Sequence, residues 1–139
     1  MEVPPVRSLG PFDLAIPVVA AVFFVFLASL IPEPTRRRFM AILVAGAGAA
    51  YLNGGLGVWE FVYIAMATYA AYRGLDSYRF IGVAWLMHTG WDVVHHLYGN
   101  PIWPFAPTSS AGCAIMDALI AIWFFAGAPD RHHFVSREA

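Results

Sequence analysis

The sequence predicts an all-α membrane protein, a bundle of five transmembrane helices with its N-terminus outside and its C-terminus in the cytoplasm. Of its 139 residues 60% are hydrophobic and only 12% are charged, whereas soluble domains carry about 25% charged residues. The apolar residues gather in five stretches, each near the length that a helix needs to cross a bilayer. We therefore expect one multi-pass integral membrane domain over residues 1–139.

The first two expected spans are separated by a proline-containing break. Residues 12–31 form an apolar run that Pro32 and Pro34 close, because proline lacks the backbone N–H that a helix requires. The chain starts with an acid and two prolines where a secretory signal carries basic residues, so we expect this span to be retained. The second span, 39–52, is rich in alanine and glycine, which let helix backbones approach closely in lipid.

Turn residues also delimit the last three expected spans. The third covers residues 58–72 and follows an Asn-Gly-Gly turn, and the fourth covers 80–97 and is ended by Gly-Asn-Pro. Glycine, asparagine and proline are strong turn signals in such runs. The fifth span covers 110–126 and leads into a polar tail in which we expect His132 and His133 to be solvated.

The arginines provide a test of this topology. If consecutive loops alternate sides, seven of the eight arginines lie on one side of the membrane and only Arg7 lies on the other. Cytoplasmic loops of membrane proteins are enriched in Lys and Arg, which orients the chain with its N-terminus outside. The segment Arg36–Arg38 would then face the cytoplasm and contact anionic lipid.

The fourth span is interrupted by polar residues that repeat at helical spacing. His88, Asp92, His95 and His96 occur in one short stretch, and at about 100° per residue they share one face of a helix. Such a stripe is expected where lipid lies outside the helix and a site lies inside. The spacing leaves open whether His95 or His96 points inward, because their directions differ by about 100°.

Two other spans carry acidic residues at a similar depth. Glu60 lies in the third span and Asp117 in the fifth, so the topology places both with Asp92 in the outer half of the bilayer. A charge at such depth costs about 2.5–3.5 kcal/mol on insertion scales, so we expect these carboxyl groups to be protonated, paired with histidine or bound to a cation. The residues expected to wall the pocket are Asn53, Trp59, Tyr63, Trp85, Trp91, Ser110 and Cys113.

The first functional hypothesis is a metal-dependent enzyme, either a hydrolase or an oxidoreductase, that acts on a lipid-soluble substrate. Imidazole and carboxylate ligands without a thiolate favour Zn, Fe or Mn, and such an ion could activate a bound water or oxygen. The chain has no lysine, which excludes a lysine Schiff base with retinal or pyridoxal phosphate. The candidate metal ligands are His88, Asp92, His95, His96 and Asp117. The candidate catalytic residues are Glu60, Asp92 and Asp117.

Three other functions stay open. A protonated carboxyl group in an aromatic-walled cavity could protonate an isoprenoid or sterol double bond without a metal, as an isomerase or cyclase does. A ladder of histidine and aspartate could instead belong to a proton-linked transport or channel component. The same residues could also fix helix register in a structural subunit of a membrane complex. The expected partners are membrane lipid and a lipid-soluble small molecule, with a homo-oligomer or larger complex left open and no nucleic acid.

The stretch HTGWDVVHHLYGNPIWPFAPTSSAGCAIMDALIA, residues 88–121, resembles an uncharacterised family of small bacterial integral membrane proteins. The resemblance extends over most of the chain and implies no particular activity. Through His95 and His96 the fourth span is also similar to membrane diiron hydroxylases and desaturases, although their remaining histidine boxes are absent. In its mixture of histidine and aspartate this span is similar to intramembrane zinc hydrolases that cleave lipid amides.

Overall fold

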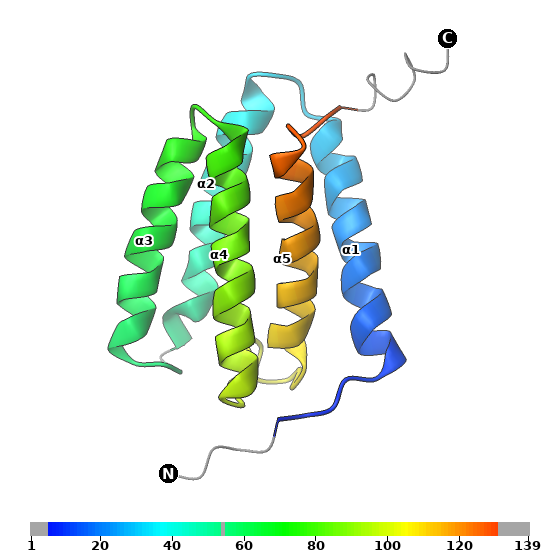
Figure 1. Ribbon diagram of the computed structural model, residues 1–139, viewed down its shortest axis with the longest axis vertical. Helices are drawn as coiled ribbons and strands as arrows, with labels where there is room; N and C mark the ends of the chain where they lie inside the picture. The colour runs from blue at the N-terminus through cyan, green and yellow to red at the C-terminus, as the bar shows by residue number, and fades with distance from the viewer. Residues whose placement is uncertain (1–5, 54, 131–139) are drawn as a thin grey trace.

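The computed structural model describes residues 6–53 and 55–130, and within these ranges the chain folds into helices without a strand. Figure 1 shows the helices in chain order. They are α1 (Pro11–Ser29), α2 (Thr35–Ala47), the 3₁₀ helix η1 (Gly48–Asn53), α3 (Val58–Gly74), α4 (Tyr78–Leu97) and α5 (Ser109–Phe125). The prediction of an all-helical chain with five helices is thus confirmed for the described residues.

The helices form an up-and-down bundle. In Figure 1 the helices α3, α4, α5 and α1 lie side by side, and α2 lies behind them. The helix α4 packs between α3 and α5, α5 also packs against α1, and α2 contacts both α3 and α4. Since α1 begins at one end of the bundle and α5 ends at the other, the chain makes an odd number of passes along it.

The second helix differs from the prediction. It begins at Thr35 rather than at residue 39, so that Arg36 lies in its first turn. At Gly48 the α-helix changes to the 3₁₀ helix η1, because the Gly48 N–H bonds to the carbonyl oxygens of Ala45 and Gly46. Glycine has a weak preference for the α-helix, which fits a change of helix type within this glycine- and alanine-rich run.

The apolar core lies where the five helices meet. Each helix contributes to it, with Ala21 from α1, Val44 from α2, Ala71 from α3, Ile81 from α4 and Phe124 from α5, all at most 2% exposed. Small side chains such as alanine let the helices approach closely. This core fills the half of the bundle that contains the end of α3 and the start of α4.

The outer surface of the bundle is strongly apolar. Large apolar side chains on every helix are mostly exposed, for example Phe12 at 78%, Ile42 at 66%, Phe61 at 66%, Leu86 at 52% and Ile122 at 63%. Exposed apolar patches of this extent mark a surface that contacts lipid or another protein. The buried polar residues, by contrast, include an arginine, three carboxylic acids and two histidines.

One helix of the described residues is long and apolar enough to cross a membrane, judged by length and composition. It is α1, with 19 residues. The helix α5 is also apolar but has 17 residues. The helix α4 has 20 residues, but it carries Arg79, Asp92 and three histidines, which reduce its hydropathy.

Candidate functional site

Polar side chains from separate helices converge in one half of the bundle. Glu60, His88, Asp92 and His95 are each at most 1% exposed, and Asp117 is 8% exposed. Glu60 lies in the first turn of α3, while His95 lies in the last turn of α4. Because these two helices are antiparallel neighbours, the start of one lies beside the end of the other (Figure 1). The site is thus at the end of the bundle opposite to the loop that joins α3 and α4.

The helix α4 supplies most of the site from one face. His88, Asp92 and His95 are all buried, as their helical spacing predicts. His96 is partly exposed and takes no part in the hydrogen bonds that hold the other three side chains. Of the two adjacent histidines, His95 is therefore the one that points inward.

Asp92 and Asp117 form a carboxyl pair between α4 and α5. Oδ1 of Asp92 accepts a hydrogen bond of 2.8 Å from the Tyr51 hydroxyl of η1. Asp117 is buried on α5, which packs against α4, and the charges of the two acids interact. Oδ2 of Asp92 is buried and has no hydrogen-bond partner among the described residues. Because two ionised carboxylates would repel each other in a buried site, we expect one of the two acids to carry a proton.

The position of that proton follows from the hydrogen bond of Tyr51. A donor directed at a carboxylate stabilises its charged form, and Tyr51 directs its donor at Asp92. We therefore assign the proton to Asp117 and the charge to Asp92. The pair can then deliver one proton and accept one.

His88 is held by both of its ring nitrogens. Nε2 lies 3.0 Å from the carbonyl oxygen of Val44, which can only accept, so we assign the hydrogen to Nε2. Nδ1 then accepts, and the Tyr63 hydroxyl donates to it at 2.9 Å. The Tyr51 hydroxyl is 3.1 Å from the same nitrogen, but its hydrogen is already directed at Asp92. His88 thus positions two tyrosines and has no free nitrogen.

The change of helix type at Gly48 provides the acceptor for His88. In a continued α-helix the N–H of Gly48 would bond to Val44, four residues earlier. It bonds to Ala45 and Gly46 instead, and the Val44 carbonyl accepts from the imidazole. The same change carries Tyr51 of η1 to the carboxyl pair.

Glu60 has a donor on each carboxylate oxygen. Oε1 accepts from the Leu56 N–H at 3.0 Å and lies 3.1 Å from Nε2 of His95. Oε2 accepts from the indole N–H of Trp91 at 2.8 Å. The other nitrogen of His95, Nδ1, lies 3.1 Å from the side-chain nitrogen of Asn100. We call Glu60, Trp91 and His95 the Glu60 cluster; each of its polar groups has a partner within the cluster or on Leu56 or Asn100.

The candidate metal ligands of the described residues are not arranged as a metal site. In the part of the chain that the structure describes, no three His, Cys, Asp or Glu side chains are placed so that they could hold a metal ion. Both nitrogens of His88 are bonded within the protein, and Nε2 of His95 faces Glu60. Binding of Zn, Fe or Mn would require these side chains to rearrange, and it stays a prediction.

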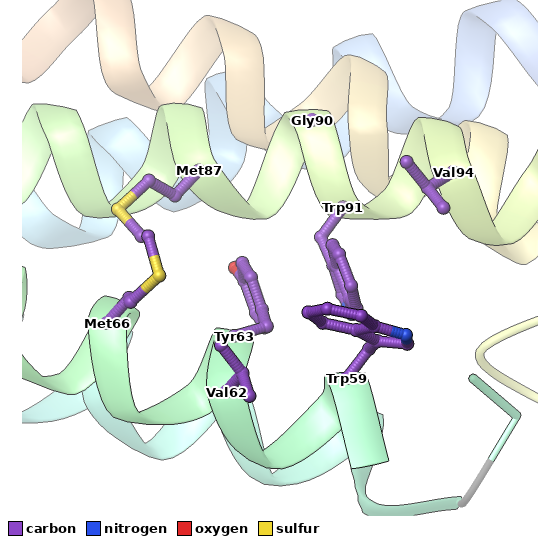
Figure 2. Close-up of a pocket in the computed structure, with 8 residues that line it drawn as sticks. All are labelled: Trp59, Val62, Tyr63, Met66, Met87, Gly90, Trp91 and Val94. Carbon is purple, nitrogen blue, oxygen red and sulfur yellow. The ribbon is translucent and has the colours of Figure 1, made fainter. Parts of the chain in front are cut away.

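Two grooves border the polar site. The first, of about 430 Å³, lies between α3 and α4, and Figure 2 shows its lining. The rings of Tyr63 and Trp91 stack there with centroids 4.7 Å apart and an interplanar angle of 1°. Their polar atoms bond to His88 and Glu60 in the interior. The stacked pair therefore separates this groove from the buried acids.

The second groove, of about 320 Å³, lies between α1 and α5. It is lined by both polar and apolar residues, among them Asp13, Pro17, Thr108, Cys113 and Met116. Cys113 is half-buried and lies within electrostatic reach of both acids of the carboxyl pair. Of the two grooves, this one leads toward the acids.

Residues 12–130 match the model of DUF6010, a family of unknown function. The chain belongs to this family. The match covers the five helices except Pro11 and includes every residue of the site, so the predicted resemblance to an uncharacterised family is confirmed. No curated protein and no solved structure matches the chain.

Not every residue expected in the pocket wall of this DUF6010 member lies at the site. Trp59 is 63% exposed and lines the groove between α3 and α4. Trp85 belongs to the apolar core, and its ring centroid lies 5.7 Å from that of His88 at the border of the site. Ser110 accepts from the Ile102 N–H and donates to the Asn100 carbonyl, so it anchors the loop before α5. The Asn53 side chain, like His132 and His133 of the tail, lies outside the described part of the chain.

The prediction missed Tyr51, Asn100 and the Val44 carbonyl. Tyr51 is the single aromatic residue in the glycine- and alanine-rich run that becomes η1. A polar aromatic residue among such small neighbours was a signal that could have drawn attention to it. The role of the Val44 carbonyl depends on the change of helix type and leaves no mark in the sequence.

Proposed function

We propose that this member of DUF6010 is an integral membrane protein whose five helices all cross the bilayer. The apolar outer faces and the polar interior support this proposal, because lipid is the solvent that favours such an arrangement. Arg37, Arg38, Arg73 and Arg79 lie at the end of the bundle opposite to Arg7, which supports an N-terminus outside. The site then lies in the outer half of the membrane.

We further propose that the protein is a metal-free isomerase of a lipid-soluble alkene of the isoprenoid or sterol class. The single observation that carries this proposal is the buried pair of acids Asp92 and Asp117, in which Oδ1 of Asp92 accepts from Tyr51 while its Oδ2 has no hydrogen-bond partner among the described residues. A proton held between two acids away from water is suited to general acid catalysis.

The reaction is balanced by the carboxyl pair alone. Asp117 gives its proton to one carbon of the double bond, the π electrons form the new C–H bond, and the neighbouring carbon becomes a cation. The carboxyl pair then takes a proton from a carbon beside the cation, and the electrons of that C–H bond form the shifted double bond. Substrate and product are isomers, and the pair returns to its starting state.

The surrounding residues position the pair. Tyr51 keeps the charge on Asp92 through its hydrogen bond, and His88 stacks on Tyr51 with ring centroids 5.4 Å apart. Burial excludes water, which would otherwise capture the cation. Apolar core residues such as Ile81, Ile120 and Phe124 lie between this site and the group of Arg36, Tyr78 and Glu33 at the arginine-rich end, which favours an enzyme over a proton path.

Deuterium transfer tests this function. The purified protein in nanodiscs is incubated in D₂O with squalene, farnesol or cholesterol, and mass spectrometry measures deuterium bound to carbon in the recovered lipid. We expect incorporation by the parent protein and a loss of at least about 100-fold in Asp117→Asn and Asp92→Asn. Asp76→Asn, which changes an exposed acid at the far end, should behave as the parent. Equal incorporation by Asp117→Asn and the parent would overturn the proposal.

A further inference from the structure

The groove between α1 and α5 has one polar and one apolar end. At the polar end the Thr108 hydroxyl donates to Oδ1 of Asp13 at 2.7 Å, and the Gly10 N–H donates to Oδ2 at 2.8 Å. Toward the middle of the helices the lining becomes apolar, with Ala20 and Met116. The groove thus fits an elongated molecule with one polar end.

The polar end offers hydrogen-bond acceptors. Asp13 supplies a carboxylate, each oxygen of which can accept more than one hydrogen bond. Pro17, which lies in the interior of α1 and lines the groove, has no N–H, so the carbonyl of Asp13 lacks its α-helical donor. The carboxylate of Asp13, which lines the groove, can therefore accept a hydrogen bond from a ligand that donates one. A hydroxyl group meets this requirement, whereas a carboxylate or a phosphate would be repelled.

The apolar part of the groove approaches the carboxyl pair. Cys113 lines the groove and lies one helical turn before Asp117 on α5. It is within electrostatic reach of both Asp117 and Asp92. A double bond lying against Cys113 would therefore be near the acid to which we assign the proton.

The groove between α3 and α4 lacks these features. Its polar groups, the Tyr63 hydroxyl and the Trp91 N–H, are directed inward at His88 and Glu60. Figure 2 shows Tyr63 and Trp91 in the lining of this groove, where their rings stack. Their polar atoms point away from the groove, so nothing in it would orient a polar end. This groove serves as a matched control for the other.

We infer that the groove between α1 and α5 binds the substrate, and that this substrate is an unsaturated isoprenoid alcohol. Its hydroxyl donates to Asp13 beside Thr108, and its chain runs past Cys113 toward Met116. This inference rests on the proposed isomerase function for the fate of the double bond, but binding itself can be measured without turnover.

The single cysteine of the chain makes the test specific, because Cys113 is the only residue with a thiol. The intact mass of the full-length protein in nanodiscs reports the rate at which N-ethylmaleimide modifies Cys113, with and without farnesol. We expect farnesol to slow the modification about tenfold. Asp13→Asn and Thr108→Val, which weaken the polar end, should raise the farnesol concentration needed for protection by about tenfold.

Two glycines supply matched variants that need no ligand. A side chain at Gly112, beside Cys113, or at Gly90, in the groove between α3 and α4, would meet no atom within 4 Å at its Cβ. Gly112→Leu should slow modification of Cys113 in the absence of farnesol, and Gly90→Leu should leave the rate unchanged. Equal slowing by both variants would overturn the placement of the groove.

Other probes decide the class of ligand. The inference is overturned if farnesol gives no protection, if the saturated hydrocarbon farnesane protects equally well, or if farnesyl phosphate or farnesylamine protects better than farnesol. Protection of Cys113 by farnesol without deuterium transfer would retain the binding site and defeat the isomerase. Deuterium transfer without protection of Cys113 would support the isomerase and overturn the binding site in this groove.

Discussion

The Tyr51 hydroxyl donates to Oδ1 of Asp92 across 2.8 Å and so joins the 3₁₀ helix η1 to α4, the helix that also carries His88 and His95. Asp92 is 0% exposed, and a buried carboxylate is stable only if hydrogen bonds or charges compensate for lost water. Tyr51 provides that compensation on Oδ1, whereas Oδ2 has no hydrogen-bond partner among the described residues.

Tyr51→Phe removes this hydrogen bond while it keeps the ring. We expect a loss of about 1–3 kcal/mol in the free energy of unfolding, because one oxygen of Asp92 loses its donor, together with slower deuterium transfer. Unfolding of the detergent-solubilised protein, followed by circular dichroism, measures the first effect. Tyr72→Phe, whose side chain is 66% exposed, is the control. If the two variants unfold alike, Tyr51 does not have the role assigned to it.

Glu60→Gln disturbs the Glu60 cluster. The amide can still accept from Leu56, but its NH₂ group would face the indole N–H of Trp91 or the ring nitrogen of His95. We expect a destabilisation of about 1–3 kcal/mol from the unsatisfied donors, measured as for Tyr51. Asp76→Asn changes an exposed acid at the far end and should cost less than about 1 kcal/mol. A larger loss in Asp76→Asn would contradict this assignment.

The helices and the inward face of α4 could be predicted from the sequence because both follow from regular spacing. Apolar runs between turn signals give five helices, and the period of 3.6 residues brings His88, Asp92 and His95 to one face. The antiparallel order then brings Asp117 and Glu60 to the same depth. A short 3₁₀ segment or a loop has no periodic sequence pattern, so the positions of Tyr51 and Asn100 at the site could not be predicted.

The state of the histidines could not be predicted either. Residue type alone makes His88 a candidate metal ligand, but its availability depends on the backbone near it. The Val44 carbonyl accepts from Nε2 only because the α-helix ends at Gly48. Likewise, His95 and His96 are equivalent by spacing, and the contact with Glu60 distinguishes them.

Gly74→Ala tests the close approach of α3 and α4. A Cβ atom at Gly74 would lie 2.6 Å from Cγ1 of Ile81 and 3.3 Å from its backbone nitrogen. We expect a destabilisation of about 1–3 kcal/mol, because the helices must move apart. Gly46→Ala, where a Cβ meets nothing within 4 Å, should be neutral or stabilising by up to about 1 kcal/mol. Equal unfolding temperatures of the two variants would show that α3 and α4 do not pack so closely.

The five-span topology predicts which ends of the bundle lie in the cytoplasm. In a Cys113→Ser background, a cysteine in place of Val6 should react with a membrane-impermeant maleimide added outside intact cells. A cysteine in place of Arg38 should react only after the membrane is opened. Val6 is 49% exposed and Arg38 is also exposed, so burial would not mask either site. Labelling of both positions, or of neither, in intact cells would refute five spans.

Metal analysis tests the first hypothesis against the proposed metal-free chemistry. Since both nitrogens of His88 are bonded to Tyr63 and Val44, we expect less than stoichiometric Zn, Fe or Mn in protein purified without chelator, measured by plasma mass spectrometry. Treatment with EDTA should then leave deuterium transfer unchanged, because the proton comes from the carboxyl pair.

The metal content of the variants His88→Ala and Asp92→Ala distinguishes metal-dependent from metal-free chemistry. A metal held by the site would be present at about one ion per chain in the parent and absent from both variants, since each would remove a ligand. That result would mean that a bound metal ion replaces hydrogen bonds of His88. A metal content that is low and equal in all three proteins leaves the carboxyl pair as the source of chemistry, with His88 acting through the position of Tyr51.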